Sequence, residues 1–167
     1  MSHRTVVKIK HTVHVHPQYL GAALCAYIER ETRAHFEKKW TEQRGYVESI
    51  VIDPIGCSAG LINTRTGFVD VDVDLMATVY KPEQGQLVTT IIESIDSFGV
   101  HAYAGPLRMF VAKQMLARKY RIEKHQLVGR HEGEEQTLQV GDSVRLRIIG
   151  TSWVDGAYFS IAQLAED

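Results

Sequence analysis

The stretch GQLVTTIIESIDSFGVH, residues 85–101, opens the part of the chain that decides the fold. Apolar residues recur through its first ten positions, and the Phe-Gly pair that begins at Phe98 then marks a turn. A second stretch, GDSVRLRII at residues 141–149, alternates cleanly: its apolar side chains share one face of a strand, and Arg145 and Arg147 share the other. These two stretches predict short antiparallel strands around an apolar interior.

Turn residues divide the second half of the chain into short segments of strand character. One longer insertion separates the third segment from the fourth. Five short strands in about 80 residues, with one insertion, are typical of an OB barrel. The expected strands are 86–95, 98–103, 107–112, 143–150 and 157–163.

The first half has a different pattern. Residues 5–15 and 46–52 are rich in Val and Ile, and residues 68–80 alternate Val with Asp, so each is expected to form a strand. A helix is expected from about Gly21 to Trp40, with Pro17 in its first turn and Glu37 facing outward. This half is therefore expected to be an α+β unit.

The segment Lys-Pro-Glu-Gln-Gly that begins at Lys81 interrupts both patterns, so we place a domain boundary there. The expected domains are residues 1–81 and 82–167. The net charge of −1, from 19 Lys and Arg against 20 Asp and Glu, disfavours a protein that grips duplex DNA alone. Cys25 and Cys57 stand far apart, which favours two reduced, partly buried thiols. We expect no secretory signal and no membrane-spanning helix.

The two stretches quoted first resemble the opening strand and the Gly-Asp-x-Val strand of S1 RNA-binding domains. In the first half, HPQYLG at 16–21, GYV at 45–47, TGFV at 66–69 and VYKP at 79–82 follow in the order found in a polymerase family. Together both halves resemble the stalk subunit family represented by the seventh subunit of eukaryotic RNA polymerase II. Archaeal polymerases and polymerases I and III have counterparts.

This resemblance implies a fold and a role. The fold is α+β: an RNP-like tip domain, an antiparallel sheet with one helix, followed by an S1-type OB-fold barrel. The tip domain docks to the polymerase core, and the fourth subunit of the enzyme binds as the stalk partner. The barrel meets single-stranded nascent RNA weakly. The implied protein is nuclear, acts in transcription initiation, and has no active site and no cofactor.

Single-stranded RNA is held by aromatic stacking and by basic residues that follow the backbone. Phe98 matches a stacking position of S1 domains, and His101 stands where a second aromatic is common. Phe110 is expected in the core, and the usual histidine position falls on Ala112. The candidate RNA-binding residues are Phe98, His101, Lys113, Arg145, Arg147 and Tyr158.

Residues 108–130 carry seven basic side chains and one acidic one, followed by Glu132, Glu134 and Glu135. The local excess of positive charge favours contact with phosphate. A solvated insertion of mixed charge explains the same pattern equally well.

A loop of small residues in the first half permits close approach of the backbone to another surface. The resemblance makes it the tip that enters the core enzyme. The candidate docking residues are Gly56, Cys57, Ser58, Ala59, Gly60 and Gly67. The pattern Gly-x-Ser-x-Gly at 56–60 also matches the nucleophile elbow of hydrolases. That elbow needs a strand-to-helix turn, and the residues that follow do not favour a helix.

Two patterns suggest metal ions at first sight. Asp70-x-Asp72-x-Asp74 lacks the Gly and Glu that a calcium loop requires at its sixth and twelfth positions. His14 and His16 share a strand face, but a full set of zinc ligands is not evident. No metal is expected.

Three other functions remain open. A free-standing S1 protein of translation or RNA decay would bind RNA appreciably by itself, with steep salt dependence. The equivalent subunit of polymerase III or of an archaeal polymerase would share both domains. An esterase would lose turnover when Ser58 is replaced by Ala.

Overall fold

The computed structural model describes residues 4–53, 60–116 and 119–165. The chain divides into two compact units, one from Arg4 to Lys81 and one from Pro82 onward.

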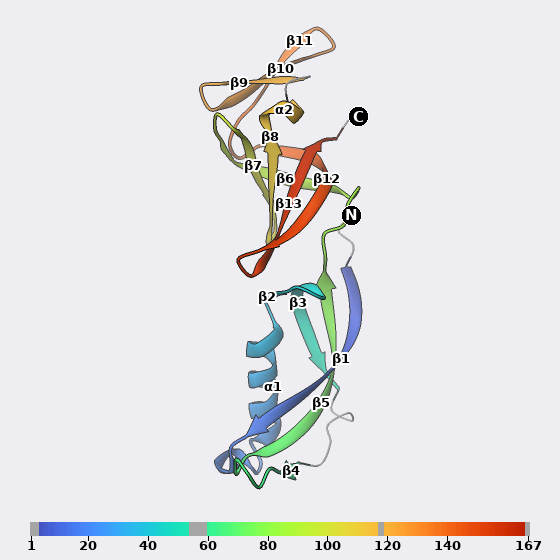
Figure 1. Ribbon diagram of the computed structural model, residues 1–167, viewed down its shortest axis with the longest axis vertical. Helices are drawn as coiled ribbons and strands as arrows, with labels where there is room; N and C mark the ends of the chain where they lie inside the picture. Colours follow the sequence, from blue (N-terminus) through green and yellow to red (C-terminus); the bar gives the residue numbers. More distant parts are fainter. Residues whose placement is uncertain (1–3, 54–59, 117–118, 166–167) are drawn as a thin grey trace. The chain divides into compact units, whose positions relative to one another are not determined.

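The first unit is a curved antiparallel sheet with one helix across one face (Figure 1). The sheet order is β1-β5-β3-β2, with β4 paired to β5. Its elements are β1 (Arg4–Val15), the 3-10 helix η1 (Pro17–Tyr19), α1 (Leu24–Phe36), β2 (Lys39–Thr41), β3 (Gly45–Ile52), β4 (Leu61–Ile62) and β5 (Val69–Tyr80).

The core of the first unit lies between β5 and α1. The alternation of β5 is confirmed: the Val, Leu and Ala side chains of its odd positions are buried, and Leu75 and Val73 are fully enclosed. The helix adds Ile28, Thr32 and Phe36, which recur every four residues and therefore share one face. On the opposite face of the sheet, acidic residues of β5 meet polar residues of β1.

Three details of the helix differ from expectation. The α-helix is shorter, and Pro17 begins the separate helix η1. The prediction that Glu37 faces outward is wrong. Its carboxylate accepts hydrogen bonds from the backbone N–H of Ile50 at 3.1 Å and from Arg33 Nη1 at 2.5 Å. Glu37 is the C-cap residue of α1, and its side chain accepts a hydrogen bond from the backbone of β3. The periodicity of a helix does not predict such a contact beyond the end of the helix.

The second unit is a closed five-stranded barrel, as the alternating stretches predict (Figure 1). Its order is β12-β13-β8-β7-β6, and β13 and β8 are the one parallel pair among the barrel pairings described. The strands are β6 (Leu87–Ile95), β7 (Gly99–Ala104), β8 (Leu107–Ala112), β12 (Ser143–Val154) and β13 (Ala157–Leu164).

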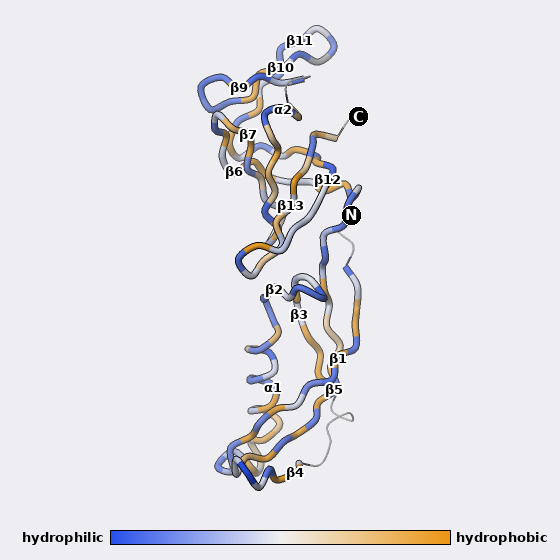
Figure 2. The backbone as a smooth tube through the Cα atoms, in the orientation of Figure 1, coloured by the Kyte–Doolittle hydropathy of each residue, from blue (hydrophilic) through white to orange (hydrophobic). Residues whose placement is uncertain are grey.

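The insertion between β8 and β12 has regular structure that the sequence did not predict. It forms a three-stranded antiparallel sheet in the order β11-β10-β9, preceded by a short helix. Figure 2 shows hydrophilic residues at its hairpin turns. Leu127 of the sheet and Leu116 of the short helix are both buried, and the short helix contacts β7, β8 and β13 of the barrel. The elements are α2 (Lys113–Leu116), β9 (Tyr120–Glu123), β10 (Gln126–His131) and β11 (Glu134–Leu138).

Candidate nucleic-acid interface and tip surface

The turn between β6 and β7 holds Phe98 out from the barrel. The Asp96 carboxylate accepts hydrogen bonds from the backbone N–H groups of Phe98 at 2.8 Å and Gly99 at 3.0 Å. These bonds hold the pKa of Asp96 below its usual range, with a smaller contribution from His101, whose Nε2 lies 3.4 Å from the carboxylate. The Phe98 side chain is 78% exposed. A large apolar ring is thus fixed at its backbone and open to solvent.

His101 continues this surface along the outer side of the barrel. It lies opposite Phe110 of β8, and the two ring centroids are 4.9 Å apart. Ile161 of β13 lies beside Phe110 and is 48% exposed. We call Phe98, His101, Phe110 and Ile161 the barrel face. The expectation that Phe110 is a core residue is wrong, because Met109 and Val111 point inward and leave Phe110 outside and half-buried.

The candidate basic residues lie at one end of the barrel face. Lys113 is exposed, and its backbone N–H donates to the carbonyl of Phe98 at 2.9 Å. Arg147 is exposed on β12, opposite Gln163, which is two residues beyond Ile161 on β13. Arg145 is exposed two residues before Arg147. All three residues are exposed, and their role in following phosphates stays a prediction.

Tyr158 is not brought to the barrel face. It lies at the other end of β13, beside the turn into that strand, and packs edge-on against Trp153 with centroids 5.1 Å apart. Its position alternates with those of Phe159 and Ile161, so it does not share their side of the strand. The alternation of side chains along residues 157–163 predicts that Tyr158 and Ile161 lie on different sides of the strand. That Tyr158 is aromatic does not by itself place it on the barrel face.

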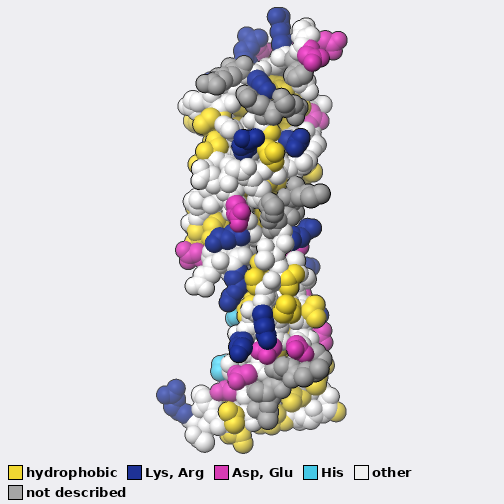
Figure 3. Space-filling view, turned by 90° about the vertical axis from the view of Figure 1, so that its right-hand side faces the viewer, with side chains coloured by type: hydrophobic (Ala, Val, Ile, Leu, Met, Phe, Trp, Pro, Cys, Tyr) yellow, Lys and Arg dark blue, Asp and Glu magenta, His cyan; other side chains and the backbone are white. Residues whose placement is uncertain are grey.

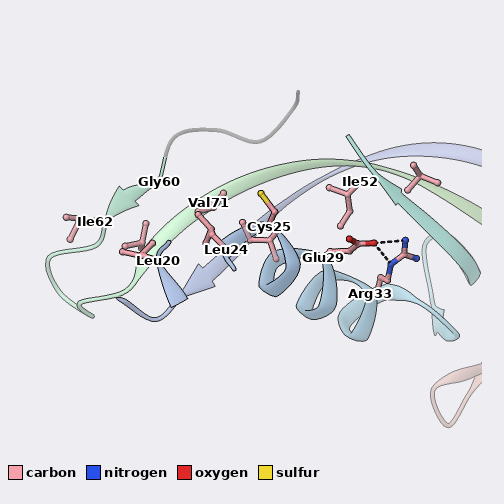
Figure 4. A pocket seen from close by; sticks show the side chains of 12 residues that line it. Leu20, Leu24, Cys25, Glu29, Arg33, Ile52, Gly60, Ile62 and Val71 are labelled. Carbon is pink, nitrogen blue, oxygen red and sulfur yellow. Dashed lines mark hydrogen bonds and ion pairs between the residues drawn. The ribbon is translucent and has the colours of Figure 1, made fainter. Parts of the chain in front are cut away.

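An apolar groove lies between α1 and the sheet of the first unit (Figure 4). Its volume is about 630 Å³, and Glu29 and Arg33 form an ion pair at one end, with 3.0 Å between Arg33 Nη2 and Glu29 Oε1. At the other end, Leu61 and Ile62 of β4 are 74% and 72% exposed. The apolar lining consists of Leu20, Leu24, Cys25, Ile28, Val51, Ile52, Gly60, Ile62, Val69 and Val71.

Of the candidate docking residues, the structure describes Gly60 and Gly67. Gly60 lines the groove, and a Cβ there would overlap the side chain of Val69. Gly67 has φ +76° in the turn that leads to β5. Gly56, Cys57, Ser58 and Ala59 lie outside the described residues. Cys25 is exposed, so its expected partial burial is wrong.

Comparison with known proteins identifies a family for the second unit and relatives that cover both units. The sequence matches the S1 RNA binding domain over residues 81–161. The second unit is an S1 domain. Similarity extends well beyond it: the DNA-directed RNA polymerase II subunit rpb7 of Schizosaccharomyces pombe is 27% identical over 157 residues, which cover 93% of this chain and 91% of that protein.

Other relatives of the same kind cover both units. DNA-directed RNA polymerase II subunit 7 of Arabidopsis thaliana is 26% identical over 96% of this chain and 92% of its own length. DNA-directed RNA polymerase subunit Rpo7 of Sulfolobus acidocaldarius is 25% identical over 94% of this chain and 86% of its own. The chain therefore resembles the seventh subunit of RNA polymerase II along nearly its whole length, and not through its S1 domain alone.

The S1 domain also shows two features that the sequence reading missed. Phe110 takes the place beside His101, whereas Ala112 lies opposite Gly99 at the end of β8. Arg108 and Glu93 form an ion pair on the outer side of the barrel, which raises the pKa of Arg108 and lowers that of Glu93. Strand register reveals the first feature, because it shows that His101 and Phe110 are neighbours. The second joins β6 to β8 across β7, at a residue of β6 where the register shifts.

The histidines of the first unit serve packing and pairing. His14 Nδ1 lies 2.6 Å from Asp70 Oδ1, and His11 stacks on His35 with centroids 4.8 Å apart. Within the described ranges, no three His, Cys, Asp or Glu side chains gather as metal ligands. In the same ranges no helix has both the length and the apolar character that crossing a bilayer requires.

Proposed function

We propose that this chain is a non-catalytic stalk subunit of the nuclear RNA polymerase II. The first unit docks to the polymerase core, the fourth subunit binds as its stalk partner, and the barrel face meets nascent single-stranded RNA. The carrying observation is similarity to subunit 7 of that enzyme over 93–96% of the chain, across both units. A shared S1 domain alone would match only residues 81–161.

The first test is association. Native purification of the tagged chain from its own cells is expected to recover the largest polymerase II subunits and a stalk partner. Recovery of polymerase III or an archaeal-type enzyme instead would assign the chain to that machine. Purification of the chain with no polymerase at all would contradict the proposal and favour a free-standing S1 protein.

The proposed docking surface is tested by introducing negatively charged residues into β4, at the exposed end of the groove. Leu61→Asp with Ile62→Asp puts two carboxylates on side chains that are already open to water, so folding is preserved. We expect recovery of the polymerase to fall at least tenfold, because an interface core does not accept unpaired charge. The matched control is Val140→Asp with Val154→Asp, at two exposed apolar positions of the second unit. Equal loss from both double variants would contradict docking at β4.

The RNA contact is tested with the purified full chain and a fluorescent 20-mer of uridine. Stacking on an aromatic side chain contributes about 1–3 kcal/mol per base, so Phe98→Ala is expected to raise Kd by about 5- to 150-fold. Ile91→Ala is the control, at a less exposed apolar position of β6. An unchanged Kd for Phe98→Ala would remove the barrel face from the proposal and leave the docking role standing.

A further inference from the structure

The outer side of the barrel continues past the barrel face as a second row of side chains. In the barrel face, His101 of β7 lies opposite Phe110 of β8. Two residues further along these strands, Tyr103 of β7 lies opposite Arg108 of β8, and Arg108 lies opposite Phe159 of β13. Residues two apart in a strand point to the same side, so the two rows share one surface. We call Tyr103, Arg108 and Phe159 the second row.

The second row places a cation between two aromatic side chains. Tyr103 is 36% exposed and Phe159 is half-buried, whereas the Arg108 side chain is 61% exposed. Sites for single-stranded RNA combine rings that stack on bases with cations that follow the backbone. Figure 3 shows that Lys and Arg side chains lie among hydrophobic ones on the visible face of the second unit. The second row therefore has the composition of an RNA contact.

Arg108 already has an anionic partner, because Glu93 of β6 reaches it across β7. Glu93 is the extra residue where the register of β6 and β7 shifts between Ile92 and Ser94. A β-bulge of this kind turns a side chain away from its regular direction. Arg108 Nη1 donates a hydrogen bond to Glu93 Oε2, and the two side chains form an ion pair. The ion pair thus crosses the outer side of β7.

This ion pair lies between the barrel face and the second row. His101 and Tyr103 pair with residues of β6 on either side of Glu93, so Glu93 stands level with the step between them. The hydrogen bond with Arg108 is the main cause of the lowered pKa of Glu93, and His101 contributes to it. The raised pKa of Arg108 likewise arises first from Glu93, with a contribution from Tyr103. A phosphate that reaches Arg108 has to replace this carboxylate.

We propose that Arg108 is a phosphate contact of the RNA-binding surface and that Glu93 competes with RNA for it. Tyr103 and Phe159 offer their rings to bases. The inference rests on the RNA contact proposed for the barrel face, but it depends on different residues. An exposed ion pair is weak, so a phosphate displaces Glu93 at a modest cost in affinity. RNA is favoured over an acidic peptide because rings flank the cation on both sides, inside the stretch that matches the S1 RNA binding domain.

The first comparison removes the competitor. Binding of a fluorescent uridine 20-mer to the full chain is measured between 50 and 200 mM salt. Glu93→Gln keeps the size of the side chain and is expected to lower Kd at 50 mM salt by about two- to fivefold, the range that an exposed ion pair contributes.

The matched control is Glu48→Gln in the first unit. Glu48 of β3 pairs with Arg4 of β1 across β5, with 2.8 Å between Arg4 Nε and Glu48 Oε2. The change of net charge is the same as in Glu93→Gln, and Kd is expected to change by no more than about 1.5-fold, because salt screens distant charges. Equal gains in Glu93→Gln and Glu48→Gln would show an effect of general charge and overturn the inference.

A second comparison isolates the phosphate contact. Arg108→Gln is introduced into the Glu93→Gln chain, so that no unpaired carboxylate remains. Relative to Glu93→Gln alone, Kd at 50 mM salt is expected to rise about fivefold or more, and the salt slope to fall by about 0.7, the contribution of one phosphate contact to a single strand. Arg4→Gln in the Glu48→Gln chain is the matched control, with an unchanged slope expected. An unchanged slope in the Arg108 variant would overturn Arg108 as a phosphate contact.

The same measurements separate this inference from the RNA contact of the barrel face. A loss of binding in Phe98→Ala, with no effect of the Glu93 and Arg108 variants, would overturn the second row and leave the barrel face standing. Effects confined to the Glu93 and Arg108 variants would support the second row and remove Phe98 from the site. If neither the parent nor Glu93→Gln binds the uridine 20-mer at 50 mM salt, the inference and the proposed RNA contact are both overturned.

Ring variants and a competitor separate RNA from an acidic protein segment. Tyr103→Ala is expected to raise Kd about fivefold or more, whereas Tyr103→Phe keeps the ring and is expected to stay within about twofold of the parent. An unchanged Kd for Tyr103→Ala would overturn stacking in the second row. Poly-glutamate that competes as well as unlabelled uridine 20-mer of equal charge would overturn RNA as the ligand. Unfolding midpoints within about 2 °C of the parent, the effect of a surface change, would show that the variants are folded.

Discussion

His11 sits on the helix side of β1 beside two other aromatic rings. Its imidazole stacks on His35 and meets Phe36 edge-on at 4.9 Å. Burial lowers the pKa of His11, and the nearby His35 and His14 lower it further. The neutral form is thus favoured in the folded unit, and the unfolded chain binds more protons below about pH 6.5.

The first prediction follows from the lowered pKa of His11. The stability of the first unit is expected to fall as pH drops from 7.5 to 5.5, because protons then favour the unfolded chain. His11→Gln is expected to reduce this dependence. Thermal unfolding midpoints at the two pH values measure both effects, and His16→Gln, at the exposed residue that follows β1, is the control. A midpoint that falls equally with pH in the parent and in His11→Gln would contradict the role of His11.

The orientation of Phe110 could not be predicted from the sequence without knowing how the strands pair. Its neighbours Met109 and Val111 are both apolar, so alternation alone does not say which of the three points inward. The register with His101 decides it, because both lie on the outer side of the barrel. Phe98 and Gly99, by contrast, form a turn recognisable from the sequence, and the structure places Phe98 in solvent as a stacking residue requires. The RNA-binding roles themselves stay predictions.

At the scale of elements, alternation predicted β1, β3 and β5 of the first unit and the five barrel strands. It missed the insertion sheet and β2, which begins inside the range expected to be helical. The barrel strands and β5 are long enough for their apolar positions to stand out, and their bounds agree closely with expectation. In β9 and β11 polar and charged residues outnumber apolar ones when the two strands are taken together, and no side chain of either strand is fully buried. These strands are defined by their pairing with β10. Strands that are this short and bury this little do not stand out in the sequence by alternation.

The second prediction concerns the start of β7. A Cβ on Gly99 would overlap the carbonyl oxygen of Val111 and lie 2.9 Å from the Phe110 ring. Gly99→Ala is therefore expected to destabilise the second unit by about 1–3 kcal/mol, the usual cost of overpacking. Gly150→Ala on β12 meets open space and is expected to be nearly neutral. Denaturant unfolding of both variants provides the measurement, and equal stability would show that β7 and β8 separate at little cost.

At the scale of the whole molecule, two separate apolar centres explain why the chain divides at Lys81. Leu75 is fully buried in the first unit, and Leu146 is buried in the barrel. The break in pattern at Lys81 and Pro82 lies where the structure passes from one compact unit to the other. The sequence reveals this organisation because each unit has its own alternation. The role of each unit depends on the molecules that it binds. The packing inside a unit does not identify these molecules.

The last prediction tests whether the two units unfold independently. Leu75→Ala removes a fully buried side chain and is expected to cost about 2–5 kcal/mol in the first unit. Hydrogen exchange followed by mass spectrometry is expected to show faster exchange in β1, β3 and β5, with unchanged exchange in β6 to β8. Leu146→Ala in the barrel is expected to give the reverse pattern. If either variant accelerates exchange equally in both sheets, the chain unfolds as one cooperative body, and separate docking and RNA-binding units lose their physical basis.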